Sequence, residues 1–308
     1  MRGLFASGFI AGALVLAAPR AAFTQADEVA DFYRGRNVTL LIGSGVGGSF
    51  DMGGRLIAQH LRRFIPGNPN IVVQNMAGAS GVRAAEYFHS VAPRDGSAIA
   101  DIQPSIVLNK ALDPAARYDP SEFFWIGRLR ERVNFGLVWH EAPARTIEEA
   151  RVKEVIFAAN SATGYTGMIP WAVNRIAGTK IKVVTGYESE ATEWLAIQRN
   201  EAHGIGSASL TGVPQPDWTA NGLVRAMYAI GLNRSRIVPY APTLVEIAGN
   251  DLDRKAMTLL ASAADIGEML FAPPGVPEAR RNALRRAFDA MMRDPEDRKS
   301  TRLNSSHT

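Results

Sequence analysis

The 308-residue chain contains no cysteine, which excludes disulfide bonds, thiolate metal sites and cysteine nucleophiles. His60, His89, His140 and His203 form no H-E-x-x-H or similar metal spacing, and no serine lies in a G-x-S-x-G segment. After Ala18, no apolar run approaches the roughly 20 residues that span a membrane. We therefore predict no metal, no cofactor and no catalytic residue.

The first residues have the features of a secretory signal peptide. Arg2 precedes the uncharged apolar run from Leu4 to Ala18, and small residues then lead to Ala26. The alternative, a membrane anchor, needs a longer run than these roughly 15 residues. We predict that residues 1–26 are removed and that the rest of the chain works outside the cytoplasm.

The charge of the chain is low and dispersed. The formal net charge of +4 falls by two when Arg2 and Arg20 leave with the signal. The arginine pairs at 62–63, 280–281 and 285–286 are typical of solvated helix faces. We predict no nucleic-acid partner.

From Val38 onward, short β-rich runs alternate with amphipathic stretches, a pattern typical of parallel strands joined by helices. Strands are expected at 38–42, 71–74, 98–102, 125–129, 133–139, 155–159, 181–184, in a short run ending at 206–209, and at 269–272. Helices are expected at 51–64, with Met52, Leu56 and Leu61 on one side, then from 82 to about 91, around 171–176, at 191–199 and at 278–292. The sequence therefore predicts an α/β protein.

The mature chain of about 280 residues suits two lobes rather than one small core. The extended runs near 125–139 are expected to cross into a second lobe, and the run at 269–272 to return. We assign 27–129 plus 263–297 to lobe 1 and 130–262 to lobe 2. Residues 298–308 are polar and show no apolar period, so we predict a disordered or non-native tail.

A glycine-rich turn follows the first expected strand. Gly43, Gly45, Gly47 and Gly48 allow a tight turn with bare amides, and the helix start beyond them adds a positive dipole end. Small polar loops follow the other strands, at 77–81, 103–105, 160–164, 185–189 and 206–209. Because ligands of open α/β sheets sit beyond the carboxyl ends of strands, these loops are expected to open a cleft.

The same turn spells G-x-G-x-x-G at Gly43, Gly45 and Gly48, the pattern of a dinucleotide fingerprint. That fingerprint also needs an acidic side chain about 20 residues later to hold the ribose hydroxyls, but the second strand ends in Gln74 and Asn75. Asp51, in the first helical turn, would repel a pyrophosphate. The turn therefore favours a simpler anion.

Seven short motifs lie along the chain in a specific order and spacing. They are FYRGR at 32–36, GGSFD at 47–51, IPGNP at 65–69, VVQNMAGA at 72–79, VAPRDG at 91–96, FAPPGVP at 271–277 and RDPE at 293–296. Together they resemble the Bug family, the periplasmic solute-binding proteins of tripartite tricarboxylate transporters. The resemblance covers nearly the whole mature chain.

The resemblance implies a two-lobed periplasmic binding protein of the type II fold, with mixed sheets flanked by helices and a ligand cleft between the lobes. Such a protein closes over a small organic carboxylate and presents it to membrane transporter subunits. We expect a monomer in the periplasm, without catalytic activity. Two other functions stay open: an exported α/β enzyme of unrecognised type, and a binding protein that acts as a sensor partner.

The family holds its ligand largely with loop amides, hydroxyls and waters, which avoids the large desolvation cost of a buried cation. Carried over by position, the ligand-binding residues are Ser44, Gly45, Val46, Gly47, Gly48 and Asp51 in the first loop, Ala77, Gly78, Ala79 and Ser80 in the second, and Ser161, Thr163, Tyr187 and Ser207 in the second lobe. A valine at Gly47 is expected to fill space that the carboxylate needs.

Several of these positions have a structural alternative. Ser49 either caps its helix or contacts the ligand. Asp51 either stabilises the helix, through the helix dipole or as a cap, or contacts the ligand. Ser161 and Thr163 can cap the helix beyond them, and Tyr187 can pack in the core with its hydroxyl at the rim.

The chain also departs from the family pattern. The family commonly has an aromatic residue where Ser44 stands and prolines where Val46 and Ala77 stand, which predicts a pocket that is wider or more polar at one end. Three acidic residues near the rim of the second lobe are expected to face solvent: Glu188, Glu190 and Glu193. A carboxylate in the cleft would instead indicate a ligand with an amine or amide.

Overall fold

The computed structural model describes residues 25–130 and 133–295. The predicted signal peptide, except for its last two residues, and the predicted tail at 298–308 lie outside this part of the chain. Within it, no helix combines the length and the apolar character that crossing a membrane requires.

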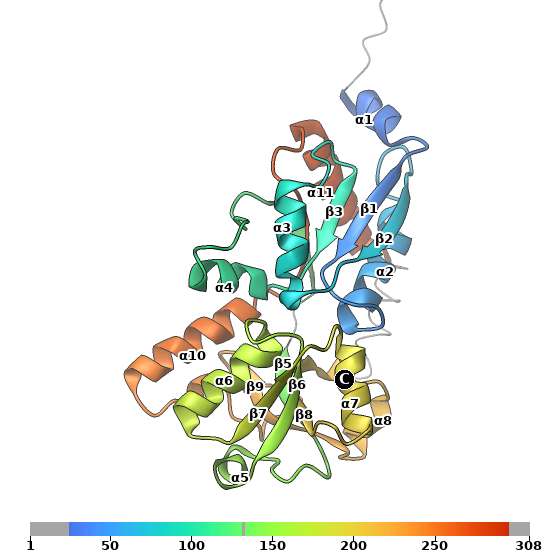
Figure 1. The fold of residues 1–308 in the computed structure, drawn as a ribbon. Coiled ribbons are helices and arrows are strands. Elements are labelled where there is room, and N and C mark those ends of the chain that lie inside the picture. The colour runs from blue at the N-terminus through green and yellow to red at the C-terminus, as the bar shows by residue number, and fades with distance from the viewer. Residues whose placement is uncertain (1–24, 131–132, 296–308) are drawn as a thin grey trace, which may run out of the picture.

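Two five-stranded sheets, each flanked by helices, form the two lobes (Figure 1). The first sheet has the order β2-β1-β3-β10-β4, with β1 at Asn37–Ile42, β2 at Asn70–Asn75, β3 at Ala98–Asp101, β4 at Phe124–Arg130 and β10 at Glu268–Ala272. The second has the order β7-β6-β8-β5-β9, with β5 at Asn134–Trp139, β6 at Val155–Ala159, β7 at Ile181–Thr185, β8 at Gly204–Ser209 and β9 at Val224–Ile230. The predicted α/β class with mixed sheets is confirmed.

Both sheets combine parallel and antiparallel pairs. In the first sheet β1 pairs in parallel with β2 and β3, whereas β10 runs antiparallel to β3 and β4. In the second sheet β6 pairs in parallel with β7 and β8, and β5 runs antiparallel to β8 and β9. The antiparallel strands β4, β5 and β10 are those at which the chain leaves the first sheet and returns to it.

The helices cover both faces of each sheet. The first sheet carries α1 (Gln25–Tyr33), α2 (Ser49–Leu61), the single 3₁₀ turn η1 (Ala79–Gly81), α3 (Val82–Ser90), α4 (Ser105–Leu112) and α11 (Glu278–Arg293). The second carries α5 (Ile147–Val152), α6 (Tyr165–Ala177), α7 (Glu190–Gln198), η2 (Leu210–Gly212), α8 (Pro216–Ala220), α9 (Leu244–Ile247) and α10 (Asp251–Ala264). Sequence analysis did not predict β9 or the helices α1, α4, α5, α8, α9 and α10.

Successive side chains of a strand point to opposite faces of the sheet, and both faces of each sheet are buried. In β1, Leu40 and Ile42 pack in one apolar cluster with α2 and α11, while Leu41 packs in another with α3. In β6, Phe157 and Ala158 likewise belong to clusters on opposite faces. A strand buried on both faces is apolar at nearly every position, which is why these runs were recognisable in the sequence.

The prediction that Met52, Leu56 and Leu61 lie on one side of α2 was wrong. Met52 is 55 % exposed, whereas Gly54, Ile57, Ala58 and Leu61 are buried against the first sheet. Met52 and Leu61 are nine residues apart, which places them on opposite sides of a helix. Met52 and Leu56 line an outer groove at the junction of the lobes.

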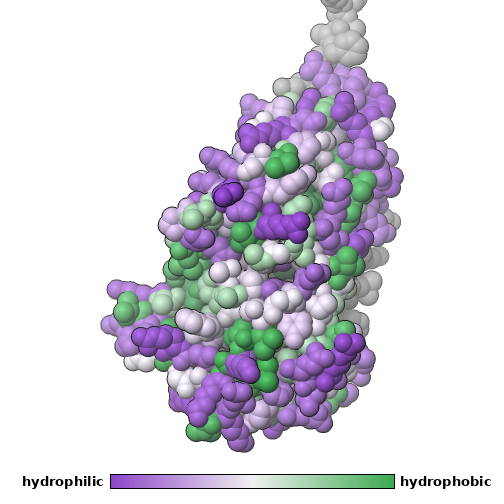
Figure 2. Space-filling view, in the orientation of Figure 1, coloured by the Kyte–Doolittle hydropathy of each residue, from purple (hydrophilic) through white to green (hydrophobic). Residues whose placement is uncertain are grey.

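An apolar contact also joins the lobes beside the strand crossings. Leu108 of α4 shares a buried cluster with Met257 and Leu260 of α10, and the two helices touch (Figure 1). On the molecular surface, hydrophilic residues cover both lobes, and paler, less polar residues gather across the junction (Figure 2).

We predict that Gly127→Ala destabilises the fold. A Cβ at Gly127 in β4 would lie 2.1 Å from the ring of Phe288 in α11, a residue that is buried against the first sheet. Overpacking of this kind costs about 1–3 kcal/mol. Urea unfolding measures the loss, and Gly249→Ala, where nothing lies within 4 Å of the new Cβ, is the matched control. Equal stability of the two variants would contradict the packing argument.

Candidate functional site

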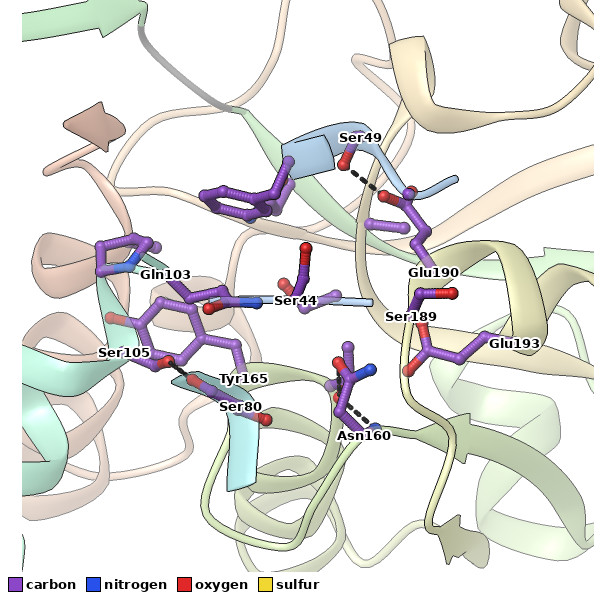
Figure 3. Close-up of a pocket in the computed structure, with 18 residues that line it drawn as sticks. Ser44, Ser49, Ser80, Gln103, Ser105, Asn160, Tyr165, Ser189, Glu190 and Glu193 are labelled. Atoms are coloured by element: carbon purple, nitrogen blue, oxygen red, sulfur yellow. Dashed lines mark hydrogen bonds between the residues drawn. The ribbon is translucent and has the colours of Figure 1, made fainter. Parts of the chain in front are cut away.

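A cavity of about 70 Å³ lies between the lobes. Its walls are formed by Ser44, Gly48, Ser49, Phe50, Ser80, Gln103, Pro104 and Ser105 from the first lobe and by Asn134, Asn160, Tyr165, Thr166, Ser189, Glu190, Glu193, Ser207, Ala208 and Ala264 from the rest of the chain (Figure 3). Since one water needs about 10–15 Å³ by this measure, the cavity has room for roughly five water-sized groups. It suits a small molecule.

The cavity lies where strands end. Ser44, Gln103 and Asn160 follow the carboxyl ends of β1, β3 and β6. Asn134 begins β5 opposite Ser209, because the two strands are antiparallel, and so reaches the same edge. The sheet topology therefore brings loops that are far apart in sequence to one place.

Helix N-termini converge on the same cavity. Ser49 begins α2, Ser105 begins α4 and Tyr165 begins α6. The residues before them, Gly48, Pro104 and Gly164, make no side-chain capping hydrogen bond. Three positive dipole ends without a side-chain cap thus face the cavity, an arrangement that suits an anionic group.

The structure brings four of the fourteen predicted ligand residues to the cavity wall: Ser44, Gly48, Ser80 and Ser207. The remaining ten lie outside this wall: Gly45, Val46, Gly47, Asp51, Ala77, Gly78, Ala79, Ser161, Thr163 and Tyr187. Ligand contact stays a prediction for all fourteen. Val46 is 65 % exposed, and Tyr187 packs against an apolar cluster of the second lobe.

The expectation of bare amides in the glycine turn was wrong for three of its four glycines. Gly43 donates to the Asp101 carbonyl at 3.0 Å, and Gly47 donates to the Asp51 carboxylate at 3.0 Å. Gly45 donates across the lobe junction to the Glu188 carbonyl, also at 3.0 Å. Gly47 has a φ of +86° and lines the outer groove rather than the cavity, so a valine there would strain the backbone instead of filling the cavity.

Asp51 stabilises the glycine turn through hydrogen bonds. It is 2 % exposed and accepts hydrogen bonds from Gly47, from the Arg55 guanidinium at 3.0 Å and from the Asn75 amide at 2.9 Å. Burial acts to raise the pKa of this carboxyl, but the hydrogen bonds from Arg55, Gly47 and Asn75 outweigh it and hold the pKa below its usual value. Asp51 therefore shapes the turn.

Three contacts join the lobes around the cavity. The Ser49 hydroxyl donates to Glu190 Oε2, the Gly45 amide donates to the Glu188 carbonyl, and the Ser80 and Ser161 hydroxyls lie 3.0 Å apart. Ser49 is the first residue of α2 rather than its cap, so the capping alternative for Ser49 was wrong. Ser161 accepts the Gly164 amide at 3.0 Å and so also supports the turn before α6.

Two carboxylates enter the cavity, contrary to the expectation that they face solvent. Glu193 is 1 % exposed, and Glu190 lines the same wall (Figure 3). Burial raises the pKa of Glu193 well above its usual value, and the nearby Glu190 adds to the rise; hydrogen bonds from Asn160 and Thr166 act in the opposite direction. Glu188, by contrast, is exposed as expected.

Sequence reasoning missed several wall residues. Gln103, Ser105 and Asn160 lie in loops that were recognised as strand ends but not assigned to the site. Their position beyond β3 and β6 was the available signal. Asn134 and Tyr165 carried no such signal, because only the pairing of β5 and the start of α6 bring them to the cavity.

The chain was compared with known proteins. No family model matches it. A protein of Cupriavidus necator described as the UPF0065 protein in the gbd 5′ region is 26 % identical over 291 residues, which cover 91 % of this chain and 84 % of that protein. MatC from Rhodopseudomonas palustris, solved with bound malate, has a TM-score of 0.69 at 21 % identity, with 85 % of this chain and 86 % of that chain covered.

The periplasmic binding protein BugD has a TM-score of 0.68 at 18 % identity, with 87 % of this chain and 86 % of BugD covered. The chain has the two-lobed fold of the Bug-type periplasmic binding proteins. This confirms the resemblance predicted from the seven motifs. Another solved structure, R. palustris Rpa4515 with adipate, has a TM-score of 0.65 at 20 % identity, with 88 % of this chain and 93 % of that chain covered.

We predict that Glu193→Gln stabilises the ligand-free protein at neutral pH. Because the folded-state pKa of Glu193 is raised, its contribution to stability is fully present below the unfolded value and is lost as the pH rises toward the folded value. The groups facing it are the Glu190 carboxylate, the Asn160 amide and the Thr166 hydroxyl, none of which is a cation. The variant should melt at least about 2 °C higher at pH 8 and show no gain near pH 4.

Melting curves across this pH range test the prediction. Glu188→Gln changes an exposed carboxylate and should show neither the gain nor its pH dependence. A Glu193→Gln protein less stable than the parent at pH 8 would refute the account.

Proposed function

We propose that the protein is an extracytoplasmic solute-binding receptor that captures a small organic carboxylate between its lobes and delivers it to a tripartite tricarboxylate-type membrane transporter. The observation that carries this proposal is the convergence of three helix N-termini without side-chain caps on one small cavity between two lobes. The bound malate of MatC and the adipate of Rpa4515 support the ligand class.

The cavity can hold a carboxylate without a buried cation. None of its described wall residues is lysine, arginine or histidine, whereas serine hydroxyls from both lobes line it, among them Ser44, Ser80, Ser105 and Ser207. Amides at helix starts and hydroxyls bind an anion at a smaller desolvation cost than an ion pair would carry. The Ser44 that replaces the family's aromatic residue keeps this wall polar.

Binding by lobe closure follows from the cleft contacts. Polar contacts of Ser49 with Glu190, Gly45 with Glu188, and Ser80 with Ser161 join the lobes around the cavity, beside the apolar contact of α4 with α10. We propose lobes at 27–129 plus 263–297 and at 130–262, moving as units about the strand crossings. The protein then acts as a monomer in the periplasm and carries out no catalysis.

The ligand class is tested by heat denaturation in the presence of linear mono-, di- and tricarboxylates, aromatic acids and amino acids. A receptor gains stability as free ligand exceeds its dissociation constant, by about 2.7 kcal/mol at a hundredfold excess. At least one carboxylate should therefore raise the melting temperature in a concentration-dependent way. No shift with any carboxylate, together with turnover of a tested compound, would favour the exported enzyme instead.

Closure is tested by Gly164→Ala. Gly164 has ordinary extended dihedrals, so alanine causes no backbone strain, but its Cβ would lie 1.8 Å from Ser80 Oγ across the cleft. The variant should fold normally yet bind ligand at least about tenfold more weakly, since full closure is blocked. Calorimetric titration gives the affinity, and Gly249→Ala is the control.

A double variant tests whether the steric block at Ser80 causes the loss of affinity. Ser80 has a φ of +51°, a region that glycine adopts easily, so Ser80→Gly removes the obstructing side chain at little conformational cost. The double variant should regain affinity relative to Gly164→Ala alone. Affinity that stays equally low in the double variant would rule out the steric explanation.

A further inference from the structure

The cavity contains more hydrogen-bond acceptors than its own residues satisfy. Five of its buried polar atoms have no partner among the described residues: Gln103 Oε1, Asn134 Oδ1, Tyr165 OH, Glu190 Oε1 and Glu193 Oε1. All but the tyrosine hydroxyl are oxygens of carboxylate or amide groups, which accept hydrogen bonds. Buried polar groups without partners are rare in folded proteins, so a cluster of them marks a site that a ligand completes.

The two carboxylates occupy one wall of the cavity. Glu190 and Glu193 are three residues apart in α7 and therefore share a face of this helix (Figure 3). Glu190 uses Oε2 to accept the Ser49 hydroxyl, which leaves Oε1 free for another donor. Glu193 is 1 % exposed, and no described residue bonds its Oε1.

No described wall residue balances these charges. The described wall contains no lysine, arginine or histidine, and the nearby Glu190 raises the free energy of the ionised form of Glu193. Serine hydroxyls and amides can donate single hydrogen bonds, but they supply no positive charge. A cationic group with several N–H donors would satisfy both unpartnered oxygens and remove the repulsion between the carboxylates.

We infer that the ligand is an amino-carboxylate whose protonated amine is held by Glu193 and Glu190, while its carboxylate faces the helix starts at Ser105 and Tyr165. This inference rests on the proposed function and names the substrate class of the same cavity. The ligand's positive end meets the carboxylates of α7, and its negative end meets the dipole ends of α4 and α6. Charge complementarity then fixes the orientation of the ligand.

The test compares matched pairs that differ only in the amine: propionate with alanine, succinate with aspartate, and glutarate with glutamate. Each compound is titrated calorimetrically into the parent protein, and the N-acetylated amino acids are titrated as a third series. We expect the amino member of the best-bound pair to bind at least about tenfold tighter than the plain acid, and N-acetylation to abolish that advantage.

Glu193→Gln tests whether the preference for the amine depends on the carboxylates of α7. Glutamine keeps the size of the side chain but removes its charge, so the variant should lose the tenfold preference for the amine and still bind a plain acid. Glu188→Gln, at an exposed position, should keep the preference. Melting curves of both variants show that the fold is intact.

The outcomes separate this inference from the proposed function. If plain acids bind as tightly as their amino partners, or if Glu193→Gln keeps the preference, the amine subsite is refuted while the carboxylate receptor stands. If N-acetylated compounds bind as tightly as free amines, the carboxylates of α7 recognise a neutral amide, and the inference of a protonated amine is wrong. If no member of any series binds, the proposed carboxylate receptor itself is refuted.

Discussion

The structure depends on one geometric constraint: parallel strands end at the same edge of their sheet, and the helices that follow them begin there. Each lobe of this protein has such an edge, and the cavity lies between the two. Polar loops and positive helix ends are therefore concentrated where the lobes meet, while the apolar clusters lie deeper in each lobe. A polar site between apolar lobes follows from this arrangement.

Some polar groups at this edge lower the stability of the protein although they can bind a ligand. Burial disfavours the ionised form of Glu193, and no described residue bonds the buried oxygens Glu190 Oε1, Gln103 Oε1 and Asn134 Oδ1. A ligand that donates hydrogen bonds to these oxygens would stabilise the arrangement of the two lobes around it.

The glycine turn shows how one pattern can support different chemistry. Its G-x-G-x-x-G spacing matches a dinucleotide fingerprint, yet the amides of Gly43, Gly45 and Gly47 are bonded to Asp101, Glu188 and Asp51. The turn is thus partly a structural element that Asp51 supports and that touches the opposite lobe. Gly48 and the start of α2 are its parts at the cavity wall.

The sequence by itself determined the α/β class, most strands, the crossings near 125–139 and 269–272, and the general position of the cleft, because strands such as β1 are buried on both faces and end in small polar loops. Of the fourteen ligand residues that the family resemblance implied, Ser44, Gly48, Ser80 and Ser207 line the cavity, and ligand contact stays a prediction. Only the tertiary structure decided that Glu193 is buried, that Met52 is exposed, and that Asn134 and Tyr165 reach the site. The physical reason is that periodicity shows which residues share a face of their own helix or strand, whereas the opposite lobe decides which of those faces is covered.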